Sequence, residues 1–294
     1  MKYINTFKNH SSYEEKLNGG GVDISLPNIS YCEDVKDVHY NPYNTVEFYV
    51  GEITPPQTVK IYTDSSTSVD VTVSEGNKWY TYVLPKDKGL YTIESGYYDD
   101  ESGDWYDGIV TKAIIKADIN KNRGTIIPYS TIKASFKDSD TSNVTDMGYF
   151  FKECSGLTSL DVSSFDTSNV TSMLHMFYFC TSLTSLDVSS FDTNNVTSML
   201  QMFYFCENLT SLTLSNFNTS KVTDMDGMFS YCSGLTSLDL SGWDMRSVTI
   251  SNKMFKGCTS LRTIRMVGCE KPTTDKIKAQ LTKDNITGVA IVTE

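Results

Sequence analysis

The residues best placed to do chemistry recur at 26-residue intervals in the second half of the chain. Each one alternates with apolar neighbours, as in Leu160-Asp161-Val162, so its side chain is expected to point to solvent from a short strand. Carboxylates on adjacent strands would lie about 5 Å apart, the separation of a retaining glycosidase pair. At that distance they should raise each other's pKa. The candidate ligand-binding column, on a concave face, is Asp161, Asp187, Thr213, Asp239 and Arg265.

Binding is favoured over hydrolysis for this column, because stacking of similar repeats produces the same spacing without any catalytic role. The chain has three histidines, and no HExxH, GxxxxGK[ST] or GxSxG motif occurs. His175 is predicted to be a solvated surface residue. We therefore expect no enzyme, no metal and no cofactor, with a carbohydrate-active enzyme as the weakest alternative.

A second polar column directly follows a recurring aromatic residue, as in Phe165-Asp166. It contains an asparagine, which would not serve as a catalytic base. Side chains of this kind accept backbone N–H hydrogen bonds in turns. The column is therefore interpreted as turn chemistry, and its members are Asp166, Asp192, Asn218 and Asp244.

These columns belong to a repeat that covers residues 155–258 with high fidelity. Within one unit, Leu160 and Val162 have the period of a strand. From Val170 the apolar positions advance by three, three, one and three, the pattern of one helix face of about three turns. One strand and one helix per unit predict a leucine-rich-repeat α/β solenoid over residues 122–270, with about five repeats.

Five of the seven cysteines share one position of the repeat. Identical environments cannot supply disulfide partners within a repeat, so we expect reduced thiols that act as small buried apolar groups. Cys32 and Cys269 fit no pattern. The five are Cys154, Cys180, Cys206, Cys232 and Cys258.

The remaining segments divide the chain into further parts. Short alternating runs separated by turn residues predict a small antiparallel β-sandwich or barrel at 44–121, suited to a spacer or an oligomerising module. Residues 271–294 predict a C-terminal cap with a helix that buries Ile277 and Leu281. Residues 1–43 read as an extended docking segment. The acidic, aromatic stretch 97–107 is interpreted as a solvated hairpin loop, with Ca²⁺ or sugar binding as the alternative.

Charge and hydropathy exclude some partners. The net charge of -11 and the lack of a basic cluster argue against nucleic acid. No apolar run reaches the roughly 18 residues of a membrane span, and the N-terminus has no signal-peptide pattern. We expect synthesis in a cytoplasm and no membrane insertion.

The unit LTSLDVSSFDTSNVTSMxxMFxxC resembles the leucine-rich repeats of BspA-like bacterial surface proteins, over residues 140–269. The resemblance implies adhesion to host proteins or to other cells. Members of that class begin with a signal peptide, which this chain lacks.

The N-terminal stretch SLPNISYCEDVKDVHYNPY is similar to a segment of virion proteins from crAss-like phages of Bacteroidales. This resemblance implies docking to capsid or other virion proteins, and release by lysis in place of export. The docking residues it implies are Leu26, Pro27, Asn28, Val38, His39, Tyr40, Asn41 and Pro42.

Together these features predict a virion surface protein, a phage capsid (head) fibre that displays the solenoid to a host-surface protein or glycan. Fibres are symmetric, so a homo-oligomer, dimer or trimer, is expected. The alternatives are a phage tail receptor-binding protein and a bacterial cell-surface adhesin.

Overall fold

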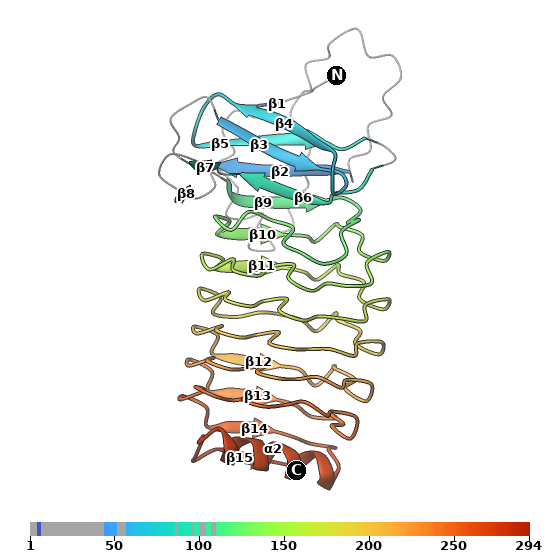
Figure 1. Cartoon of the computed structure of the whole chain (residues 1–294), viewed down its shortest axis with the longest axis vertical. Coiled ribbons are helices and arrows are strands. Elements are labelled where there is room, and N and C mark those ends of the chain that lie inside the picture. Colours follow the sequence, from blue (N-terminus) through green and yellow to red (C-terminus); the bar gives the residue numbers. More distant parts are fainter. Residues whose placement is uncertain are drawn as a thin grey trace.

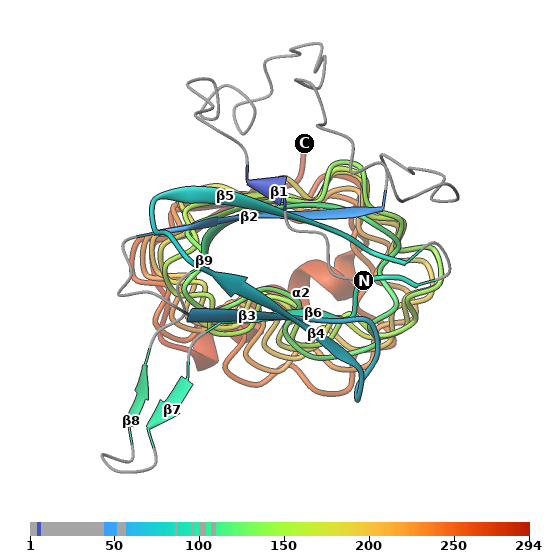
Figure 2. The same ribbon diagram turned by 90° about the horizontal axis from the view of Figure 1, so that it is seen from above.

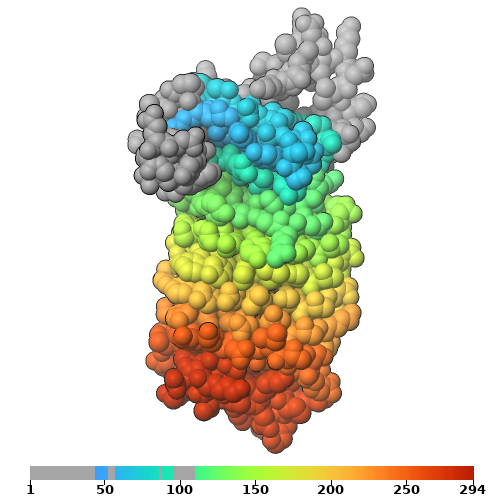
Figure 3. Space-filling model, in the orientation of Figure 1, coloured from blue at the N-terminus to red at the C-terminus, as the bar shows by residue number. Residues whose placement is uncertain are grey.

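The computed structural model describes residues 5–6, 44–51, 57–85, 88–95, 97–99, 104–106 and 110–294. It forms a rod with a β-sandwich at one end, a stack of coils in the middle and a helix at the other end (Figure 1). In the space-filling view the sandwich and the coils form one uninterrupted column (Figure 3). The fold is mostly β, and the predicted solenoid with a 26-residue period is present.

The predicted antiparallel strands of the first domain are present and lie in two layers (Figure 2). Alternating burial explains the layers, since Val46, Phe48 and Val50 are fully buried between them. One layer contains β1 (Asn5–Thr6), β5 (Lys78–Val83), β2 (Thr45–Val50) and β9 (Val110–Lys116), and the other β4 (Ser68–Val73), β3 (Gln57–Tyr62) and β6 (Thr92–Ser95). A separate hairpin joins β7 (Tyr97–Asp99) and β8 (Asp104–Tyr106).

Most solenoid coils contribute one short strand that pairs in parallel with the strand of a neighbouring coil. Leu212, for example, lies opposite Leu238, its equivalent in the following repeat. Residues 185–187 are not assigned to a strand, so the column is divided into two sheets. The strands are β10 (Lys133–Ser135), β11 (Ser159–Asp161), β12 (Ser211–Thr213), β13 (Ser237–Asp239) and β14 (Thr263–Arg265).

The predicted helix of each repeat is absent, and this part of the α/β prediction was wrong. Residues 170–180 form a series of tight turns. The apolar residues chosen from the helical period, Val170, Met173, Met176, Phe177 and Cys180, are nevertheless all buried. The apolar period reports which side chains face the core, and a chain of turns presents the same residues inward as a helix would.

Hydrogen bonds between coils replace the hydrogen bonds of the missing helix. The N–H groups of Met173, His175 and Phe177 donate to carbonyls of the following coil at 2.9–3.0 Å. The residues between them close turns, as where Tyr178 N–H donates to the carbonyl of His175. Two residues of this turn segment take positive φ in each coil, for example His175 at 56° and Phe179 at 60°. This backbone is therefore specified by stacking on the neighbouring coil.

The sandwich and the solenoid share one sheet and one core. Strand β9 pairs with β2 on one edge and, in parallel, with β10 on the other. The backbone of Ile119 also donates to Asp140, across the boundary predicted after residue 121. A single hydrophobic cluster runs from Val46 to Leu281. The sandwich thus closes the N-terminal end of the solenoid.

The C-terminal end is closed by α2 (Lys271–Lys283), which buries Ile277 and Leu281 as predicted. The helix begins with a proline in its first turn, where no N–H partner is needed. Strand β15 (Ala290–Val292) then pairs in parallel with β14. No other α-helix occurs in the part of the chain that the structure describes.

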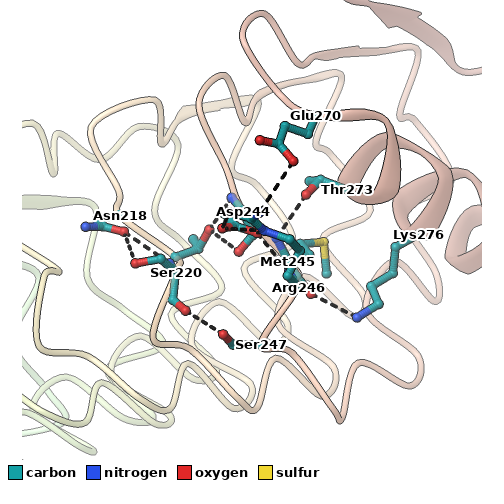
Figure 4. A network of polar contacts seen from close by, with 10 residues as sticks. Asn218, Ser220, Asp244, Met245, Arg246, Ser247, Glu270, Thr273 and Lys276 are labelled. Atoms are coloured by element: carbon teal, nitrogen blue, oxygen red, sulfur yellow. Dashed lines mark hydrogen bonds and ion pairs between the residues drawn. The ribbon is translucent and has the colours of Figure 1, made fainter.

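Side chains of α2 complete the hydrogen bonds of the last coils (Figure 4). The N–H of Met245 donates to Thr273 Oγ1 at 3.0 Å. Lys276 Nζ donates to the carbonyls of Met245 and Val248 at 2.9 and 2.7 Å. These polar groups would otherwise lie at an open end of the stack.

A search of the described residues for a helix long and apolar enough to cross a membrane found none.

Candidate functional site

The predicted ligand-binding column lies on one face of the strand stack. Thr213 pairs with Asp239, and Asp239 with Arg265, so their side chains project from equivalent positions of successive coils. Asp187 lies in the coil without an assigned strand, between Asp161 and Thr213. Asp187, Thr213 and Arg265 are exposed, and Asp161 and Asp239 are half-buried. The coils stack in a straight line (Figure 1), so this face is a flat strip along the rod and not the concave face expected from the sequence.

The aspartates of this column bind the backbone two residues ahead. Oδ1 of Asp161, Asp187 and Asp239 accepts the N–H of the second following residue, a serine, at 2.9–3.0 Å. A hydrogen bond from the Ser189 side chain, together with this backbone hydrogen bond, lowers the pKa of Asp187. The expectation that adjacent carboxylates raise each other's pKa was wrong for this residue, because the turn hydrogen bonds stabilise its charged form. A carboxylate with a lowered pKa does not suit the acid of a glycosidase pair.

Each end of the column carries further polar contacts. Ser135 Oγ donates to Asp161 Oδ2 at 3.5 Å, and Arg265 Nε lies 3.7 Å from Asp239 Oδ2. Both members of the Arg265–Asp239 pair are partly exposed, so the ion pair contributes little to stability. What the strip offers to a ligand is a row of hydroxyl and carboxylate groups that ends in a guanidinium.

The second polar column acts in turns, as predicted. Oδ1 of each member accepts the N–H two residues on, at 2.8–3.1 Å. Side-chain hydrogen bonds from Ser168 and Arg246, together with these backbone contacts, lower the pKa of Asp166 and of Asp244 respectively. Asn218 makes the equivalent contact at 3.1 Å, so the amide replaces the carboxylate without loss of the turn.

A column of buried threonines was missed by the sequence reasoning. Each hydroxyl donates to the carbonyl of the next coil, as Thr167 Oγ1 does to Asp192 at 2.8 Å. Thr167 Oγ1 also accepts the N–H of Asp192, at 2.7 Å. The signal in the sequence was a threonine that recurs two residues after the corner aromatic, as in Phe165-Asp166-Thr167. The column consists of Thr141, Thr167, Thr193 and Thr219.

The repeated cysteines are free and buried, as predicted. Each Sγ from Cys180 onward donates to the carbonyl of a phenylalanine in the preceding coil, as Cys206 does to Phe177 at 3.2 Å. Burial raises the pKa of Cys206 and of Cys258 to about 12. These thiols are therefore structural donors and poor nucleophiles. Cys269 is half-buried and free, and Cys32 lies outside the described residues.

His175 is not a solvated surface residue, contrary to the prediction. Its ring lies 5.0 Å from the ring of Tyr149 and 4.9 Å from that of Tyr178. Its Nδ1 is buried without a hydrogen-bond partner. Burial is the main cause of its lowered pKa, which a hydrogen bond with Gln201 opposes.

Two predicted sites fall on residues that the structure leaves undescribed. The docking residues Leu26, Pro27, Asn28, Val38, His39, Tyr40, Asn41 and Pro42 lie outside the described residues. Within 97–107 only the backbone of the β7–β8 hairpin is described, which agrees with the predicted hairpin. Among described residues, no cluster of three or more potential metal ligands occurs.

Comparison with known families gives one match. The family described as "Mycoplasma protein of unknown function, DUF285" matches residues 129–209 and 184–267. Comparisons with curated proteins and with solved structures gave no match. The matched residues span the coils from β10 to β14 and leave the sandwich and the cap outside. The solenoid is therefore similar to the DUF285 repeats.

Proposed function

We propose that the protein is a non-enzymatic surface protein, a phage capsid (head) fibre, whose solenoid adheres to a host or mucosal surface. The observation that carries the display role is the arrangement of the rod. The described chain after the N-terminal segment begins at the sandwich, and the capped end with α2 lies at the opposite end (Figure 1). Attachment through residues 1–43 would hold the coils away from the particle.

The strand face supports binding better than catalysis. Its side chains form a flat row of hydroxyls and carboxylates, and the carboxylates are held by turn hydrogen bonds. A flat, rigid, polar row suits a repeating ligand such as a glycan, because each coil presents similar groups at a spacing of about 4.8 Å. The rigidity of the stack lowers the entropy lost on binding.

Deletion of residues 1–43 tests the attachment. We expect the shortened protein to fold, with the circular dichroism and melting behaviour of the full chain, and to be absent from purified particles. Co-purification of the shortened protein with particles would contradict the docking role.

The copy number per particle distinguishes the alternatives. Quantitative mass spectrometry should find a number close to that of the capsomers for a head fibre, and far fewer copies for a tail receptor-binding protein. Detection on bacterial envelopes in the absence of particles would favour the adhesin.

The ligand role of the strip is tested on a glycan array. The triple variant Asp161→Asn, Asp187→Asn, Asp239→Asn should keep its turns, because an amide oxygen accepts the same N–H. It should no longer bind the glycans on the array that the unmodified protein binds. The matched control is Asp166→Asn, Asp192→Asn, Asp244→Asn, in the second column, where Asn218 already shows that an amide fits. Equal binding by both variants would remove the strip as the site.

A further inference from the structure

A stripe of half-buried aromatic side chains runs along the turn segments of the middle coils. Tyr178 stacks on Tyr204 with ring centroids 4.9 Å apart and planes within 5°. Phe179 stacks on Phe205 at 4.6 Å, and Phe205 on Tyr231 at 4.5 Å. We name these the aromatic stripe: His175, Tyr178, Phe179, Tyr204, Phe205 and Tyr231.

The fold does not require aromatic residues at these positions. The coil before the stripe has Lys152 and Glu153 at the places of Tyr178 and Phe179, and the coil after it has Lys256 and Gly257. All five coils make the same turns. Packing of the core therefore does not explain the stripe.

The aromatic residues are also held in an unfavourable backbone conformation. Phe179, Phe205 and Tyr231 have φ of 60°, 59° and 62°, a region that favours glycine, and Gly257 takes the equivalent place at 79°. Bulky residues kept at such positions point to a role beyond folding. Stacking between the rings offsets part of the strain.

The distribution of charge resembles that of a protein interface. Interfaces place aromatic residues at the centre and charged residues at the rim. Here the centre carries neutral aromatic side chains, in a chain with a net charge of -11. The rim has the exposed Glu153 beside Lys152 at one end and the exposed Lys253 and Lys256 at the other.

We propose that the aromatic stripe is the interface between two antiparallel copies of this chain. A two-fold axis through the coil of Tyr204 and Phe205 would bring the end with Glu153 opposite the end with Lys256 of the second copy. Parallel packing would place Lys253 and Lys256 of both copies together, whereas antiparallel packing places them against the Lys152–Glu153 ion pair, so the charge pattern favours the antiparallel arrangement. The five coils from Glu153 to Lys256 span about 20 Å along the rod. The rod of the second copy is long enough to cover the stripe of the first copy over this whole length. The sandwich ends of the two copies would lie at opposite ends of this dimer, so only one copy of a pair could attach to a given particle, and the proposal stands apart from the proposed display role.

Replacement of aromatic residues by glycine tests the interface with little risk to the fold. The double variant Phe179→Gly, Phe205→Gly removes two rings and relieves the positive φ at both positions. In analytical ultracentrifugation at tens of micromolar we expect the full chain to sediment as a dimer and the variant as a monomer. The melting temperature, measured at a concentration where both are monomeric, reports whether the variant is folded. A monomeric full chain, or a variant that dimerises equally, overturns the proposal.

Charge exchange tests the orientation. Glu153→Lys and Lys256→Glu should each weaken the dimer at least several-fold, because each places like charges opposite one another. The double variant should restore the dissociation constant of the unmodified chain. Additive weakening in the double variant would exclude the antiparallel arrangement.

A cysteine near the axis gives a direct readout. Tyr204→Cys lies on the middle coil and should form a disulfide between copies under mild oxidation. The control Thr197→Cys is an exposed residue of the same coil outside the stripe. A cross-linked dimer that forms with Tyr204→Cys and not with Thr197→Cys supports the proposal. The proposal is contradicted if both variants cross-link equally or if neither does.

Discussion

At the scale of single residues, the repeated polar side chains serve the contacts between coils. The threonine, aspartate and cysteine columns each satisfy backbone groups that the turns leave free. The exposed asparagines of the Asn-Val-Thr blocks do the same, since Asn195 Nδ2 donates to the carbonyl of Ser168 at 2.8 Å. A glycan attached at that nitrogen would compete with this contact. Most of the conserved spacing within the repeat is thus explained by stacking.

The cysteine column gives the first stability prediction. Cys206→Ala removes the donor to the carbonyl of Phe177 and leaves a small void, so it should lower the free energy of unfolding by about 1–3 kcal/mol. Cys206→Ser keeps a donor and should lower it less, despite the cost of a buried hydroxyl. Urea denaturation monitored by circular dichroism measures both. If Cys206→Ser is less stable than Cys206→Ala, the thiol does not stabilise the fold as a hydrogen-bond donor.

His175 gives a prediction on pH. Its pKa lies below the ordinary value of 6.5, chiefly through burial. The unfolded chain then binds the proton more readily than the folded chain does. The contribution of neutral His175 to the free energy of unfolding is therefore complete above about pH 6.5 and is lost as the pH falls through the folded pKa. His175→Gln, the residue of the next coil, should reduce the drop in melting temperature between about pH 7.5 and about pH 5. The other histidines are common to both proteins, so an unchanged drop would mean that His175 does not titrate as described.

At the scale of elements, the turn segment and the cap differ in what holds them. Residues 170–180 are fixed by hydrogen bonds to the following coil and have no helix of their own. Helix α2 has internal hydrogen bonds and adds side-chain contacts to the last coils. The ends of the stack depend on such caps, because a terminal coil lacks one neighbour.

The cap can be weakened at one side chain. Lys276→Met keeps most of the aliphatic chain and removes the hydrogen bonds to Met245 and Val248. We expect faster amide exchange in residues 237–262 and a loss of about 1–3 kcal/mol in stability. Lys278→Met, at an exposed position of the same helix, is the control and should change neither quantity. Equal exchange in the two variants would show that Lys276 does not hold the coil.

At the scale of the whole molecule, the sandwich is part of the solenoid's stability. The sheet passes from β9 into β10, and Phe136 and Phe151 are fully buried at this junction. Residues 44–121 therefore close the N-terminal end of the solenoid.

Removal of this cap gives the last prediction. A chain that begins at residue 122 should expose the dry end of the stack, bind a hydrophobic dye and aggregate. A chain that begins at residue 44 keeps every strand of the sandwich except the two-residue edge strand β1 and should remain monodisperse. Size-exclusion chromatography with light scattering compares the two, and a well-behaved shorter chain would mean that the coils close without the sandwich.

The sequence by itself determined the 26-residue period, the inward side chains, the buried cysteines, the turn role of Asp166 and its equivalents, and the cap at Ile277 and Leu281. These follow from local apolar spacing and from the chemistry of turns, which a single repeat already contains. Only the tertiary structure decided the backbone of residues 170–180, the ring contacts that half-bury His175 and the sheet that joins β9 to β10. The physical reason is that each of these depends on a hydrogen bond or a contact with a neighbouring coil. An apolar period indicates which side chains face inward. It does not indicate whether the backbone N–H groups donate within their own segment or to the next coil.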